Sequence, residues 1–302
     1  MVKALRIQGL VFSITALLVS ALSVGIGRPD EQTELIVLGV LILLLGVPHG
    51  ALDTIFAHRL YGIRTPLGWI GFVALYLLLA DAVVAFWVMA PAGFLLGFLV
   101  ISAAHFSGDP AEGTPLPVRI LQGGCVMILP SLLHEGEMGR LFALLAGQDA
   151  ADTVMPLIRL LAWIWAPCVL LAVILRARRD RLGALETVSI ALLSVAAPPL
   201  VSFTLFFCGM HSARHILRTI DYSGRASTRL LAAAALLPMA GVLIASAAAW
   251  HFLEGTPLDA RLVQIVFVGL AALTVPHMAL VERVRISGWL EGADTKRDTP
   301  YY

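Results

Sequence analysis

Histidines at helical spacing are the residues of this chain best suited to metal chemistry. His211 and His215 lie four residues apart in the segment MHSARH (210–215), within an apolar stretch. Side chains four residues apart project from the same face of a helix, so both imidazoles could reach one metal ion. The spacing alone is weak evidence, because ordinary polar pairs share it. The pair is therefore a candidate that needs support from elsewhere in the chain.

Three further histidines stand in short motifs that strengthen this candidate. They are His49 in VPHGALD (47–53), His105 in HFSGDP (105–110) and His277 in VPHMALVE (275–282). Asp53 and Asp109 each follow a histidine by one helical turn, where a carboxylate can accept the second ring N–H of a ligating imidazole. We predict that Asp53 orients His49. A proline directly after Asp109 ends its helix, so Asp109 either orients His105 or caps or lines the cytoplasmic mouth of the site.

The types of residue in these motifs narrow the choice of metal without deciding it. The three cysteines, Cys125, Cys168 and Cys208, lack C-x-x-C spacing and are predicted to be small core residues. An all-imidazole set excludes iron–sulfur clusters and the usual structural zinc sites, whereas Fe, Cu, Ni and Zn all suit imidazole. Fe(II) held by four histidines, with one or two positions open, would suit O2 activation beside a substrate dissolved in the bilayer.

The elements that must position these histidines are membrane helices. Of the 302 residues, 59% are apolar and 14% are charged, whereas soluble proteins contain about a quarter charged residues. Apolar stretches recur along the whole length, so we predict an all-α, polytopic membrane helical bundle that forms one integral-membrane domain over residues 1–302. The N-terminal apolar run is taken as a retained span, not a signal peptide. Nothing in the composition indicates nucleic-acid binding.

Apolar runs broken at charges, Pro and Gly predict about ten transmembrane helices, within a range of eight to ten. The division at Pro198-Pro199 is the least secure, since a kink and a tight turn would leave the same pattern. The candidate spans are 8–25, 34–57, 67–89, 92–108, 118–134, 154–175, 183–197, 199–217, 229–251 and 262–283.

Basic residues are strongly biased to one side of this ten-span arrangement. The N-terminal side holds most of them, including Lys3, Arg6 and the arginines of segment 176–181, whereas the other side holds mainly Arg28, Arg140 and Arg261. The positive-inside rule then places both termini in the cytoplasm. An odd number of spans would destroy the bias, which supports a division at the double proline.

All five motif histidines then fall in the cytoplasmic halves of four spans that run inward. Because intramembrane polar groups are costly and usually face a bundle interior, a shared layer of imidazoles indicates one site. The alternatives are separately hydrogen-bonded core histidines, a membrane haem protein with two axial histidines, and a metal or proton transporter, whose polar groups would line a path across both leaflets. The remaining histidines, His58, His134 and His251, are predicted to be interfacial.

The ordered set of motifs PHGAxD (48–53), HFSxD (105–109), HSxRH (211–215) and PHxxL (276–280) resembles the Brp/Blh family of bacterial and archaeal membrane β-carotene 15,15'-dioxygenases. The resemblance covers essentially the whole chain. It implies cleavage of β-carotene or a related carotenoid with O2 to two retinal molecules. It also implies a multi-pass protein of the cell inner (cytoplasmic) membrane, with a retinal-accepting rhodopsin as a partner.

The resemblance further implies which residues hold the metal. Matched motif by motif, Fe(2+) would be held by His49, His105, His211 and His215, while His277 takes an orienting or substrate-pocket role. A carotenoid would need an apolar tunnel that passes the iron roughly parallel to the membrane and opens to lipid. Candidate aromatic residues for the tunnel wall are Phe94, Phe98, Phe203, Phe206, Phe207 and Trp250.

Overall fold

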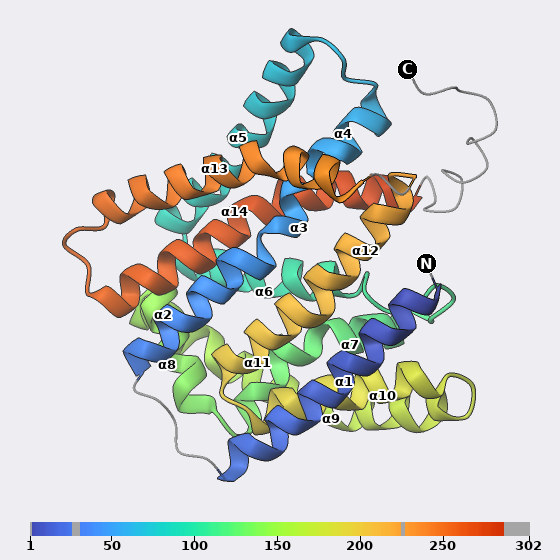
Figure 1. Ribbon diagram of the computed structural model, residues 1–302. Coiled ribbons are helices and arrows are strands. Elements are labelled where there is room, and N and C mark those ends of the chain that lie inside the picture. The colour runs from blue at the N-terminus through green and yellow to red at the C-terminus, as the bar shows by residue number, and fades with distance from the viewer. Residues whose placement is uncertain (1, 26–30, 225–226, 287–302) are drawn as a thin grey trace.

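Every regular element in the described part of the chain is a helix, in agreement with the predicted all-α class (Figure 1). The computed structural model describes residues 2–25, 31–224 and 227–286. Arg28 and the C-terminal residues 287–302 lie outside them, so the cytoplasmic location of both termini stays a prediction. The elements are α1 (Val2–Gly25), α2 (Glu31–Leu41), η1 (Ile42–Gly46), α3 (Pro48–Ala51), α4 (Asp53–Tyr61), α5 (Pro66–Met89), α6 (Pro91–Phe106), α7 (Leu116–Ile128), η2 (Leu129–Leu132), α8 (Glu135–Ala146), α9 (Gln148–Ala177), α10 (Arg181–Ala196), α11 (Pro199–Leu205), η3 (Phe206–Ser212), α12 (Ala213–Tyr222), α13 (Thr228–Phe252) and α14 (Leu258–Ile286).

The count of membrane spans differs from the predicted ten. Among the described residues, six helices are long and apolar enough to cross a bilayer, or seven if the bent pair Leu116–Leu132 and Glu135–Ala146 is one span. That pair turns by 109° where a straight span over 118–134 was expected. The break at Pro198-Pro199 is present, because α10 ends at Ala196 and α11 begins at Pro199. With 16 residues, α10 is short for a membrane span. A helix enclosed by other helices does not need the length that lipid contact demands.

The inner and outer helices differ sharply in burial. In α5 only Ala80 is buried, and α13 exposes Leu236, Leu237 and Ile244, as helices that face lipid do. By contrast, α10 buries polar side chains such as Glu186 and Thr187 in the interior. Free cysteines occur at Cys125, Cys168 and Cys208, and Cys168 is exposed, contrary to the predicted core position.

Two broken helices lie side by side through the middle of the bundle (Figure 1). The first passes from α2 through the π-helical turn η1 into α3, and the second from α11 through the π-helical turn η3 into α12. In η1 the backbone N–H of Val47 bonds to the carbonyl of Ile42 at 2.9 Å, five residues back. Such π turns inside α-helices occur frequently at functional sites. Here they precede or contain the histidines at 49 and 211.

A close helix contact fixes the end of α6, which carries His105. A Cβ on Gly123 of α7 would lie 2.6 Å from the carbonyl oxygen of Ala103 and 2.6 Å from the backbone nitrogen of Ser107. Only glycine permits the two backbones to approach this closely. The contact therefore sets the position of the last turn of α6 against the core.

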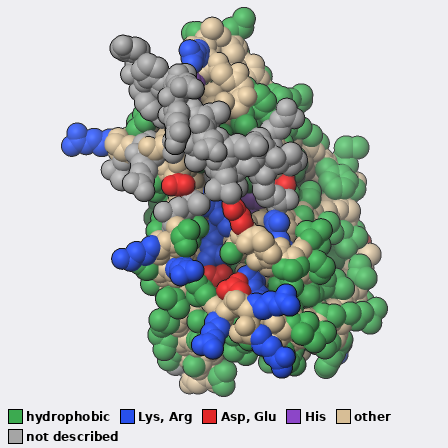
Figure 2. Space-filling model, turned by 90° about the vertical axis from the view of Figure 1, so that its right-hand side faces the viewer, with side chains coloured by type: hydrophobic (Ala, Val, Ile, Leu, Met, Phe, Trp, Pro, Cys, Tyr) green, Lys and Arg blue, Asp and Glu red, His purple; other side chains and the backbone are tan. Residues whose placement is uncertain are grey.

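Charged side chains gather on one face of the molecule, where blue and red atoms cluster in Figure 2. This face includes the N-terminal end of α1, and Arg178 and Arg179, which follow α9, are exposed. Elsewhere in this view apolar side chains dominate the surface. The separation suits a protein whose apolar flanks contact lipid and whose charged end contacts water.

Candidate metal centre

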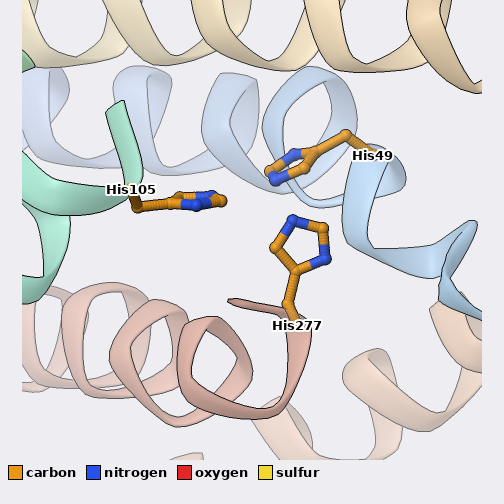
Figure 3. Close-up of side chains that lie close together, drawn as sticks. All are labelled: His49, His105 and His277. Carbon is orange, nitrogen blue, oxygen red and sulfur yellow. The ribbon is translucent and has the colours of Figure 1, made fainter. Parts of the chain in front are cut away.

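Five buried histidines from five elements meet in the interior. His49 lies on α3, His105 on the last turn of α6, His211 in η3, His215 on α12 and His277 on α14. Figure 3 shows the rings at 49, 105 and 277 directed toward one another. One possible ligand nitrogen from each of these three lies within 4.8 Å of those of the other two. Elements far apart in the sequence thus supply one compact group of imidazoles.

The histidine pair from the HxxxH motif completes this group. The ring centroid of His211 lies 4.5 Å from that of His105 and 4.9 Å from that of His49. The ring of His215 lies 5.3 Å from that of His49 and 5.0 Å from that of His277. The two rings of the pair itself are 6.4 Å apart. The remaining histidines lie outside this group. His58 and His251 are exposed, and His134 directly precedes α8.

Both aspartates orient histidines, but not those of their own motifs. Oδ1 of Asp53 lies 2.7 Å from Nδ1 of His277, not against His49 as predicted. The Asp109 carboxylate lies 3.0 and 3.1 Å from Nδ1 of His211. The Asp109 side chain is buried. Asp53 follows the bend after α3, and Asp109 follows the end of α6. Each carboxylate therefore points away from its own helix and reaches a histidine on a neighbouring one.

A backbone carbonyl takes the role at His49 that the sequence assigned to Asp53. Nδ1 of His49 lies 2.5 Å from the carbonyl oxygen of Gly46. The π turn frees this oxygen, because the N–H of Gly50 bonds to Val47 instead, at 3.1 Å. Ser212 also donates to Gly46, at 3.0 Å.

These partners determine which ring nitrogens face the centre. Carbonyl and carboxylate oxygens only accept, so Nδ1 must carry the proton in His49, His211 and His277, and Nε2 keeps a lone pair. Among the described residues, Nε2 of His211 and Nε2 of His277 are buried without a hydrogen-bond partner. A buried polar atom without a partner calls for an explanation. A metal ion bound by these nitrogens would supply one.

A buried ion pair holds the segment that carries Asp109. Arg214 bonds to Glu186 at 2.7 Å and to the carbonyl of Asp109 at 3.0 Å, while Arg218 bonds to the carbonyl of Gly108 at 2.8 Å. Gln8 of α1 accepts from Arg214 at 3.0 Å. The sequence motifs predicted no role in the site for Arg214, Glu186 or Arg218. The available signal was an arginine between two histidines in an apolar stretch, since ionisable residues there usually have a partner and a role.

Aromatic rings link the histidines to an apolar cavity of about 60 Å³. Ligand pockets measure about 300–1,000 Å³, so this cavity does not form the predicted tunnel, which stays a prediction. The cavity wall includes Phe98, Phe203 and Phe267. Phe203 stacks on Phe207 at 5.4 Å between ring centroids, and Phe207 stacks on His211 at 5.8 Å. Phe94 and Phe206 are also buried. Trp250 was predicted to line the tunnel with these phenylalanines, but it lies exposed on α13, under the guanidinium of Arg261.

Comparison with known proteins identifies the family of this chain. The family model for β-carotene 15,15'-dioxygenase matches residues 40–284, which include all five histidines and both aspartates. The chain belongs to the β-carotene 15,15'-dioxygenase family. A member of this family, the β-carotene 15,15'-dioxygenase of the uncultured marine bacterium 66A03, is 31% identical over 252 residues, covering 80% of this chain and 90% of that protein.

A more distant relative also covers most of both chains. The protein of Halobacterium salinarum (strain ATCC 700922 / JCM 11081 / NRC-1) named "Probable beta-carotene 15,15'-dioxygenase Blh" is 28% identical over 279 residues, with 79% of this chain and 81% of that protein aligned. No solved structure matches the chain.

Proposed function

We propose that this protein cleaves the central 15,15' double bond of β-carotene with O2 to give two retinal molecules. In the net reaction the double bond breaks and each of its two carbons gains one oxygen atom as an aldehyde. The observation that carries the proposal is the buried group of five imidazoles in a chain of this family. It would work in the cytoplasmic membrane, with O2 and the carotenoid arriving through lipid and a rhodopsin as the acceptor of retinal.

The cofactor in this proposal is non-haem Fe(II). The ligands would be His49, His105, His211 and His215, as the family resemblance implies. Two features of the donor set fit a metal: proton acceptors hold Nδ1 of His49 and His211, and Nε2 of His211 is buried without a partner. Iron bound there would supply the activation of O2. Neutral imidazoles suit iron, although they do not distinguish it from copper, nickel or zinc.

The chain's own residues would bind the substrate and exclude water. A polyene has no polar group to hydrogen-bond, so its recognition depends on apolar and aromatic walls. The row Phe267, Phe203, Phe207 and His211, with ring centroids 5.2, 5.4 and 5.8 Å apart in that order, offers such a wall from the cavity to the imidazoles. This arrangement supports a substrate path that ends beside the metal.

Expression in cells that make β-carotene tests the activity. We expect the wild-type chain to consume β-carotene and produce retinal, with purified protein holding about one iron per chain. His211→Ala should abolish retinal formation, whereas His251→Ala, which removes an exposed histidine outside the group, should not. A strong Soret band in purified protein would instead favour a membrane haem protein. Transport of iron or protons across vesicles without retinal formation would favour the transporter.

A further inference from the structure

His277 has the surroundings of a metal ligand. Its ring centroid lies 5.1 Å from that of His49, 5.1 Å from that of His105 and 5.0 Å from that of His215. It is therefore a member of the group and not an outer neighbour of it. Ligand nitrogens bound to one ion at about 2.0–2.2 Å lie no more than about 4.4 Å apart. The spread of 4.8 Å among nitrogens of His49, His105 and His277 needs only a small contraction to meet that limit.

The two nitrogens of His277 divide as they do in a ligating imidazole. Nδ1 lies 2.7 Å from Oδ1 of Asp53, and Nε2 is buried without a hydrogen-bond partner among the described residues. The hydroxyl of Tyr76, on α5, donates to Oδ2 of the same carboxylate at 3.0 Å. Carboxylates behind metal-bound histidines fix the tautomer and raise the basicity of the inner nitrogen. Asp53 and Tyr76 thus form an orienting pair.

His211 provides an internal comparison. It lies against Asp109 at 3.0 Å and likewise has a buried Nε2 without a partner among the described residues. The surroundings of His277 and His211 are therefore alike: an aspartate at Nδ1, a free Nε2 and neighbouring imidazoles about 5 Å away. If this pattern makes His211 a ligand, it makes His277 one as well.

We propose that His277 is a fifth imidazole ligand of the metal, with Asp53 and Tyr76 as positioning residues. This inference rests on the metal centre in the proposed function. With five imidazoles, an octahedral ion keeps a single open position. The ion would then connect α3, α6, η3, α12 and α14. Because Tyr76 holds Asp53, the lipid-facing helix α5 would also contribute to the geometry of the centre.

The number of imidazoles on iron tests this directly in wild-type protein. X-ray absorption of the iron-loaded enzyme should give five imidazole nitrogens, and His277→Ala should give four. Iron affinity, measured by competition with a chelator, should fall by at least about 100-fold in His277→Ala and by about 10- to 100-fold in Asp53→Asn. Tyr76→Phe should lower affinity less than Asp53→Asn, because the carboxylate remains.

Matched controls separate these effects from general damage. His251→Ala and Tyr61→Phe remove an exposed histidine and an exposed tyrosine outside the group, and both should bind iron as the wild type does. Four imidazoles on wild-type iron, or unchanged affinity and imidazole number in His277→Ala, would overturn the inference. If His277→Ala does not fold, the wild-type count alone decides. Wild-type protein that binds no iron, or binds it without forming retinal, would refute the proposed function instead.

Discussion

A neutral imidazole binds a metal well when its other nitrogen has a firm acceptor for its proton. In this centre three such acceptors are present: the carbonyl of Gly46, the Asp53 carboxylate and the Asp109 carboxylate. Each acceptor lies outside the helical element that carries its histidine. Single-residue changes at these acceptors should therefore alter metal binding without altering the ligands themselves.

Replacement of Asp109 by Asn tests the acceptor at His211. The amide oxygen can still accept one hydrogen bond but carries no negative charge. Nε2 of His211 therefore becomes less basic and binds the metal less tightly. We expect iron affinity and retinal formation to fall by about 10- to 100-fold while the helical content stays the same. Asp152→Asn is the control, because Asp152 is exposed on α9, where its carboxylate accepts a hydrogen bond from Gln148. Equal effects of the two changes would contradict this role.

Replacement of Gly46 by Ala tests the contact between the two π turns. A Cβ at this position would overlap the ring of Phe207, so this ring, which stacks on His211, would have to shift. We expect overpacking to cost about 1–3 kcal/mol of stability and to lower activity.

Gly71→Ala on α5 is the matched control, since its added Cβ meets nothing within 4 Å. Alanine favours a helix over glycine by up to about 1 kcal/mol, so this variant should be neutral or slightly stabilised. Thermal unfolding in detergent and a retinal assay would compare the pair. Full activity of Gly46→Ala would show that Phe207 can move without consequence.

At the scale of elements, the Arg214–Glu186 pair joins α12 to α10 inside the bundle. Their side chains are only 4% and 6% exposed. The same guanidinium bonds to the carbonyl of Asp109 in the segment after α6. The pair therefore connects α10 and α12 to the backbone of the residue whose carboxylate lies against His211.

Glu186→Gln should destabilise the protein strongly, because it leaves the Arg214 charge buried without its counter-ion. Loss of one partner of a buried pair costs about 3–5 kcal/mol. Glu135→Gln is the control: its partner Arg159 is 54% exposed, and an exposed pair contributes less than about 1 kcal/mol. Thermal unfolding of both variants in the same detergent checks the difference. A similar midpoint for the two would argue that water reaches Arg214.

At the scale of the whole molecule, apolar outer helices surround a polar centre and leave an apolar cavity beside it. The exposed leucines of α5 and α13 face outward, whereas the cavity lies among α6, α7, α8, α11 and α14. The aromatic row from Phe203 through Phe207 joins this cavity to the imidazoles. In the proposed function the carotenoid would contact the aromatic row and the metal would bind the imidazoles, so we expect that each can be altered alone.

Leu200→Trp should lower retinal formation while iron content stays at the wild-type level. Leu200 lines the small cavity at the end of the aromatic row, so an indole there would fill the cavity and obstruct the substrate path proposed along that row. The control is Leu237→Trp, on the surface of α13, where the side chain is 81% exposed and a larger ring meets no packed neighbour. Retinal yield and iron per chain would be measured for both. Unchanged turnover in Leu200→Trp would remove this cavity from the substrate path.

Much of this arrangement was already determined by the sequence. The scarcity of charge and the recurring apolar runs require helices in a membrane, because only internally hydrogen-bonded backbone is stable there. Polar side chains are costly to bury in a membrane, so the histidines at 49, 105, 211, 215 and 277 were predicted to form one site. In the structure their rings lie together in the interior. The break at Pro198-Pro199 followed from proline chemistry alone.

Only the tertiary structure decided which side chains form hydrogen bonds with each other. Spacing along one helix paired Asp53 with His49, but the π turn and the bend after it direct that carboxylate to His277 on α14. The partners of Arg214 lie 28 and 105 residues away in the chain, beyond any local pattern. Ten spans are not confirmed either: six or seven helices of the described residues are long and apolar enough to cross a bilayer, because several apolar runs form short, bent or broken helices. Local sequence specifies element type and spacing, whereas the packing of distant helices sets the contacts between them.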